Sequence, residues 1–177
     1  MSKRPRGMRR DERDGVYPHF DTDEYLFRRV PLILWPSAGD PVEVDAIELP
    51  DLSVGRSRFG HPEWVRFDVI NNVHFEDWGV IGFRVASIHS RFWVDGNQQF
   101  TFAPCHDPLD QDYPHTEVRV FLNDAHVPTL ADIPEDIHLK WRELLLREIE
   151  RLILPEQVVP VRDDRPTSRV LEPLPQG

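Results

Sequence analysis

Cysteine is almost absent from this chain of 177 residues, which contains only Cys105. A single cysteine excludes an intramolecular disulfide and indicates a reducing compartment. The sequence also lacks any apolar run of about 18 residues, the length that a helix needs to cross a bilayer. We therefore expect a cytoplasmic protein that has no contact with a membrane.

The N-terminus lacks the apolar stretch of a secretory signal. Residues 1–13 instead carry six basic and two acidic side chains, a net charge of +4. The whole chain has a net charge of −10, which leaves −14 on the remainder. A body of this charge repels phosphate backbones. We therefore expect no binding of nucleic acid except through the basic arm 1–13.

Length and composition predict one compact domain with two tails. The chain is 40% hydrophobic and 10% aromatic, which is enough to bury a sizeable core. We expect a basic disordered arm over residues 1–15, a single domain over residues 16–155 and a proline-rich tail over residues 156–177.

Much of the domain shows the period-two alternation of β-strands. The clearest alternating segments are residues 42–47, 65–70 and 115–121. An apolar run at 32–35, bounded by prolines, predicts a buried strand, and Asp95-Gly96 between two apolar segments predicts a hairpin. Gly79 and Gly82 interrupt a further strand, where we expect a bulge or a close backbone contact. The sheet should therefore be mostly antiparallel.

One long amphipathic helix is predicted over residues 130–155. Its apolar stripe consists of Ile137, Trp141, Leu144, Leu145, Ile149, Leu152 and Ile153. Asp132 and Glu135 have the spacing of a capping box, and Pro155 is expected to end the helix. The predicted fold class is α+β, a mostly antiparallel β-sheet with this one long C-terminal helix packed on it.

The densest group of polar side chains lies on two predicted strands and the turn between them. His115, Glu117 and Arg119 alternate with apolar residues, so on a strand they share one face. His106 and Asp107 end the preceding apolar segment. If the two strands pair, these residues gather at one end of the sheet.

A loop predicted over residues 51–60 contains two glycines and several hydroxyl and basic side chains. Loop backbone is free to contact a ligand, so this loop and the segment 105–119 are expected to recognise a protein partner. The residues expected to take part are Arg28, Arg56, His106, Asp107, Tyr113 and His115. The leading interpretation is a small cytoplasmic binding protein.

A divalent metal is an alternative ligand for the same segment. His106, Asp107, His115 and Glu117 offer the nitrogen and oxygen donors that suit zinc or manganese, although their spacing matches no defined motif such as HExxH. Polar loop residues more commonly satisfy backbone groups. A metal-dependent hydrolase is therefore the third interpretation.

Neither Cys105 nor Ser53 lies in a motif for nucleophilic catalysis. His106 directly follows Cys105, and adjacent side chains on an extended chain point in opposite directions. Ser53 is not part of a G-x-S-x-G elbow. We expect Cys105 to be a buried side chain that fills space in the core and has no chemical role.

Several short motifs resemble a family of small bacterial proteins. They are Arg28-Arg29, Leu52-Ser53-Val54-Gly55-Arg56, His106-Asp107-Pro108 and His115-Thr116-Glu117. The resemblance covers roughly residues 23–120 and implies a bacterial protein, but no particular activity.

The order arginine, serine, glutamate is also similar to that of one class of ADP-ribosyltransferases. This resemblance implies that Arg28 or Arg29 contacts the pyrophosphate of NAD, that Ser53 holds the nicotinamide ribose, and that Glu117 stabilises the ribosyl cation. An NAD-using enzyme is the second interpretation. Alternatively, Arg29, Arg56 and Glu117 form an ion-paired cluster with a purely structural role.

Overall fold

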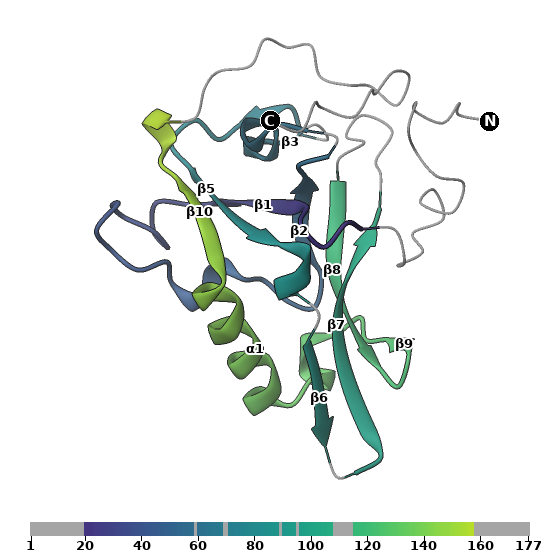
Figure 1. Ribbon diagram of the computed structural model, residues 1–177. Helices are drawn as coiled ribbons and strands as arrows, with labels where there is room; N and C mark the ends of the chain where they lie inside the picture. The colour runs from purple at the N-terminus through teal and green to yellow at the C-terminus, as the bar shows by residue number, and fades with distance from the viewer. Residues whose placement is uncertain are drawn as a thin grey trace, which may run out of the picture.

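The computed structural model describes residues 20–58, 60–68, 71–88, 90–94, 96–107 and 115–157. These ranges form an eight-stranded sheet, a separate two-stranded sheet and one α-helix (Figure 1). Strands of the large sheet follow the order β10-β5-β1-β2-β8-β7-β6, with β9 paired to β8. All of these pairings are antiparallel, and the sheet curves into a half-barrel. The prediction of a mostly antiparallel sheet with a helix is confirmed.

Short turns of 3₁₀-helix, labelled η, lie between some of the strands. In chain order the elements are β1 (Tyr25–Val30), η2 (Val44–Ala46), β2 (Leu52–Arg56), η3 (Pro62–Arg66), β3 (Phe67–Asp68), β4 (Val73–His74), β5 (Gly79–Arg84), η4 (Val85–Ser87), β6 (Ser90–Val94), β7 (Gln98–His106), β8 (His115–Leu122), β9 (Ala125–His126), η5 (Leu130–Asp132), α1 (Glu135–Arg147), β10 (Ile149–Ile153) and η6 (Pro155–Gln157).

The predicted arm 1–15 and nearly all of the predicted tail 156–177 lie outside the described residues. Within the described ranges, no helix combines the length and the apolar character that crossing a membrane requires.

One face of the large sheet, here called the inner face, forms the hydrophobic core. It carries the alternate apolar residues of each strand, such as Leu26, Leu52 and Val118, all with no exposed area. The helix α1 packs on this face, where the ring of Trp141 stacks on Phe102 at 4.4 Å between centroids. The opposite, outer face carries Ser53 of β2 and His115, Glu117 and Arg119 of β8.

The helix is shorter than the sequence pattern predicts. It has 13 residues, and the chain from Ile149 to Ile153 becomes β10. Apolar residues at these positions suit a strand as well as a helix, and as β10 they complete the hydrogen bonding of β5, which would otherwise be an open edge. The predicted capping box is also absent, because Asp132 ends η5 and Pro134 directly precedes the helix without a side-chain cap.

Two segments predicted as strands are short turns. Residues 32–35 form a turn that buries Trp35 but leaves Ile33 83% exposed. Residues 42–47 contain η2, which buries Ala46 and Ile47. Short apolar patterns of this kind suit any segment that buries only one or two side chains.

The segment 51–60 is wrongly predicted as a loop. Half of it, Leu52–Arg56, is β2, an interior strand between β1 and β8. Leu52 and Val54 are buried in the core, and this burial outweighs the low strand propensity of Gly55.

The predicted hairpin is found, and of the two alternatives for Gly79 and Gly82 the structure shows close contacts. Strands β6 and β7 pair, and Gly96 between them has a φ of 74°. A Cβ atom on Gly79 would lie 2.5 Å from the ring of Trp35, and one on Gly82 would lie 2.9 Å from Cβ of Arg151. These two positions therefore need glycine because of close packing.

The outer face is covered at one end and open at the other. Phe27 of β1 and Val80 of β5 pack there against Val65 of η3. Val65 also covers Gly55, since a Cβ atom on Gly55 would lie 2.6 Å from its Cγ1. Farther along the same face, Ser53 of β2 and His115, Glu117 and Arg119 of β8 are polar and at least partly exposed.

Candidate functional site

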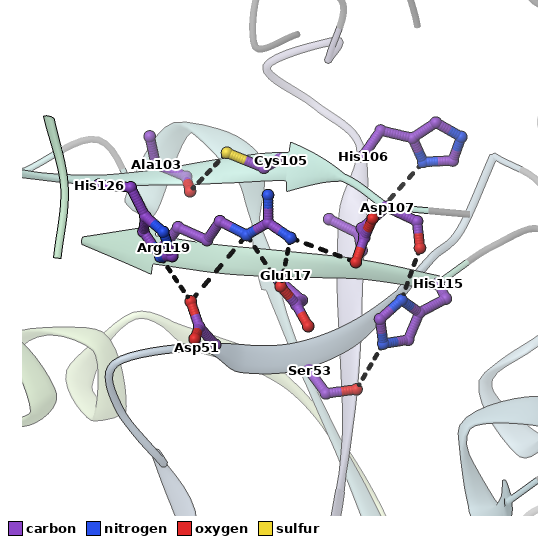
Figure 2. Close-up of polar contacts among 11 residues, drawn as sticks. Asp51, Ser53, Ala103, Cys105, His106, Asp107, His115, Glu117, Arg119 and His126 are labelled. Carbon is purple, nitrogen blue, oxygen red and sulfur yellow. Dashed lines mark hydrogen bonds and ion pairs between the residues drawn. The ribbon is translucent and has the colours of Figure 1, made fainter. Parts of the chain in front are cut away.

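Strands β7 and β8 pair as predicted and bring residues 105–107 beside the start of β8. Cys105 lies opposite Glu117, and His106 lies opposite Thr116. On the other side of β8, β2 places Ser53 opposite Glu117. Figure 2 shows the group that results. We call its outer-face members the polar face: Asp51, Ser53, Asp107, His115, Glu117, Arg119 and His126.

Arg119 lies at the centre of the polar face. Its Nε and Nη2 donate to Glu117 Oε2 at 2.8 and 2.7 Å, and Nη2 also reaches Asp107 Oδ2 at 3.2 Å. Asp51 Oδ1 lies 4.0 Å from Nε and 3.0 Å from Nε2 of His126. Burial acts against the charge of Arg119, but the hydrogen bond and the negative charges beside it outweigh burial and raise its pKa. Arg119 therefore stays charged.

His115 is held by a contact at each ring nitrogen. Nδ1 lies 2.7 Å from the backbone carbonyl oxygen of Asp107, and Nε2 lies 3.1 Å from Oγ of Ser53 (Figure 2). A carbonyl oxygen can only accept, so Nδ1 carries the hydrogen. In the neutral ring Nε2 is then an acceptor, and the Ser53 hydroxyl donates to it.

His106 does not join the polar face. Its side chain lies on the inner face, 1% exposed, with Nδ1 at 3.2 Å from Oγ1 of Thr116. Burial, followed by the positive charge of Arg56 and by His115, lowers the pKa of His106 to about 3. His106 is therefore a neutral histidine of the core.

The four residues considered for a metal ion do not converge. His106 faces the core, while His115 and Glu117 face outward, because successive side chains on a strand alternate. Arg119 also occupies the carboxylates of Glu117 and Asp107. Among the described residues, no group of three or more His, Cys, Asp or Glu side chains is placed to hold a metal ion.

Arg56 is fully buried, whereas a recognition surface needs an exposed side chain. Its Nε and Nη2 each donate to a different carboxylate oxygen of Glu24, both at 2.8 Å. The ring of Phe20 lies 4.1 Å from its guanidinium carbon. Arg56 therefore forms the kind of structural ion pair that the sequence suggested as an alternative. Its partner, however, is Glu24 and not Glu117.

Arg28 is also nearly buried, at 8% exposure, on the inner side of β1. Its Nη1 donates to the carbonyl oxygen of Ser53 at 3.1 Å, and its Nε to that of Ala46 at 3.4 Å. Nη2 lies 2.6 Å from a carboxylate oxygen of Glu48. These contacts tie β2 to β1 where the two strands no longer pair.

Arg29 points to the outer face, where η3 and the chain after β4 cover it. Its Nη1 donates to the carbonyl oxygen of Val65 at 3.1 Å, and its guanidinium lies over the ring of Phe75 at 4.5 Å. Ser53 and Glu117, in contrast, are direct cross-strand partners. The structure therefore brings together two of the three residues of the NAD hypothesis and holds Arg29 in other contacts.

Cys105 is buried, as predicted, although its strand position is on the outer face. It is 3% exposed, and its Sγ lies 3.8 Å from the carbonyl oxygen of Ala103. Burial raises the pKa of the Cys105 thiol to about 11, while Arg119 acts in the opposite direction. The thiol therefore stays protonated and unreactive near neutral pH.

The sequence did not indicate three features of the polar face: Asp51, His126 and the contact between Ser53 and His115. Ser53 and His115 are 62 residues apart, and Asp51 and His126 are 75 apart. No local motif connects residues at such separations. Tyr113 lies outside the described residues, so its predicted role stays a prediction.

Together, the fold and this site define an acidic protein built on an antiparallel sheet with a polar, partly exposed face. A scan against protein-family models found no matching family, and neither a search of curated proteins nor one of solved structures found a match. The function therefore has to be argued from the chemistry of the polar face.

Proposed function

We propose that this chain is a small cytoplasmic binding protein that recognises a protein partner through the polar face. The observation that carries the proposal is the group of three carboxylates around Arg119. Asp51, Asp107 and Glu117 are 34%, 44% and 23% exposed. One guanidinium cannot neutralise three carboxylates, so the face keeps a negative charge and free acceptor positions.

A partner that fits this surface carries lysine or arginine side chains. Such side chains donate charge-assisted hydrogen bonds to carboxylates, and these are among the stronger polar contacts between proteins. The net charge of −10 for the whole chain also attracts a basic partner at long range and speeds association.

The polar face is rigid because it is built on strands. Its central strands, β2 and β8, are each paired on both sides, and their inner residues Leu52, Val54 and Val118 are 3% exposed or less. Side chains that are held in place before binding lose less conformational entropy when a partner arrives. This supports a recognition role for the face.

The test compares two variants with the same change in net charge. One carries Asp51→Asn, Asp107→Asn and Glu117→Gln on the polar face, and the control carries Glu135→Gln, Glu143→Gln and Glu156→Gln at exposed positions elsewhere. Each protein is immobilised for capture from cell extract, and the captured protein is then purified and titrated by calorimetry.

We expect the wild type and the control to retain a basic protein that the polar-face variant binds at least about tenfold more weakly, which corresponds to roughly 1.4 kcal/mol. The affinity should also fall as salt is raised. Equal affinity of all three proteins would contradict the proposal.

An NAD-using enzyme is a second candidate, favoured by the direct pairing of Ser53 with Glu117. NAD at about 100 times its Kd would raise the stability by roughly 2.7 kcal/mol, and Glu117→Gln would reduce that gain. A thermal-shift titration with NAD measures it, and the absence of any shift would remove this candidate.

A further inference from the structure

The contact between Ser53 and His115 has the geometry of a nucleophile and its general base. The Ser53 hydroxyl donates to Nε2 at 3.1 Å, and the opposite ring nitrogen donates to the Asp107 carbonyl at 2.7 Å. That second bond holds the ring in the tautomer whose Nε2 can accept a proton. We propose that Ser53 and His115 catalyse the hydrolysis of carboxylic esters, with Ser53 as the nucleophile and His115 as the general base.

Ser53 is both exposed and fixed in position. Its neighbours Leu52 and Val54 are buried in the core, so the backbone of β2 cannot shift without loss of packing. Arg28 holds the Ser53 carbonyl oxygen at 3.1 Å from the other side. An incoming carbonyl carbon can therefore reach Oγ from solvent, while the hydroxyl stays directed at the base.

The surroundings select the charge of the substrate. Glu117 lies directly across from Ser53, and its carboxylate is one of three that share Arg119. This negative charge repels an anionic ester and favours a neutral or cationic one. On the other side, Val65 packs over Gly55, which lies opposite His115, and offers apolar contact to a small acyl group.

The reaction follows from the two side chains and water. Oγ of Ser53 forms a bond to the ester carbonyl carbon as its proton passes to Nε2 of His115. The ester C–O bond breaks, and the alcohol leaves with the proton from Nε2. A water molecule then gives a proton to Nε2 and attacks the acyl carbon. The bond to Ser53 breaks, Oγ takes the proton back, and the carboxylic acid leaves.

The experiment uses the full chain with p-nitrophenyl acetate as substrate and an acyl-enzyme search by mass spectrometry. The test variants are Ser53→Ala and His115→Asn, whose amide can keep the bond to the Asp107 carbonyl but has no counterpart of Nε2. The controls are Ser37→Ala and His74→Asn, which remove an exposed serine and an exposed histidine that both lie outside the polar face.

We expect an acetyl group on Ser53 and a rate that falls roughly a hundredfold or more in either test variant and stays unchanged in the controls. Circular dichroism of each variant confirms that it is folded. Wild-type protein without acetylation of Ser53, or a rate unchanged in Ser53→Ala, would overturn the proposal. Partner binding is measured separately with the charge variants, so failure of one proposal does not decide the other.

Discussion

Glu24 and Arg56 form an ion pair with two hydrogen bonds in the interior of the protein. Their side chains are 3% and 0% exposed, and the pair links the residue before β1 to the last residue of β2. A buried charge that loses its partner destabilises a fold far more than a broken surface pair does. This contact is therefore a main attachment between the two strands.

Glu24→Ala should lower the free energy of unfolding by about 3–5 kcal/mol, because it leaves the Arg56 guanidinium buried without its carboxylate. Urea denaturation measures the change. Glu150→Ala is the matched control, since it removes the partner of Arg84 from an exposed ion pair. If Glu24→Ala and Glu150→Ala lower the urea midpoint by a similar amount, burial does not strengthen the pair of Glu24 with Arg56, and the prediction is wrong.

His106 should make the protein less stable as the pH falls from about 6.5 to about 3, the usual and folded-state pKa values of this ring. In that range the unfolded ring binds a proton and the buried ring does not, so stability falls by up to about 1.4 kcal/mol per pH unit. His106→Asn can keep the contact with Thr116 but does not titrate. Urea denaturation at several pH values should give a flatter profile for this variant, and parallel profiles would contradict the prediction.

Cys105 should not react with thiol reagents in the folded protein at neutral or mildly alkaline pH. Its side chain is 3% exposed, and burial raises the pKa of the thiol to about 11. A colorimetric disulfide reagent should therefore label it only after denaturant is added. Rapid stoichiometric labelling without denaturant would contradict the prediction, because it would show that the end of β7, which contains Cys105, opens readily in the folded protein.

Gly79→Ala should destabilise the protein by about 1–3 kcal/mol, because the new methyl group would overlap the ring of Trp35. Gly39→Ala is the control, since no atom lies within 4 Å of the position of its new Cβ. Thermal unfolding of the two variants compares them. The prediction is wrong if both unfold at the wild-type temperature.

The candidate site was predictable only in part. Alternation along residues 115–121 was enough to place His115, Glu117 and Arg119 on one face, because the direction of a strand side chain is a local property. It was not enough to show that Ser53 would lie beside His115. That contact depends on the pairing of β2 with β8, and the segment containing Ser53 resembled a loop.

The sequence by itself determined the absence of an intramolecular disulfide, the alternation of the strands and the hairpin at Gly96. Each of these follows from the chemistry of a residue or from a pattern of a few neighbours. Only the tertiary structure decided that residues 149–153 form a strand, that Arg56 is buried with Glu24, and that the polar face assembles from distant segments. Those outcomes depend on which strand edges remain to be paired and which side chains the core encloses, and these are properties of the whole sheet.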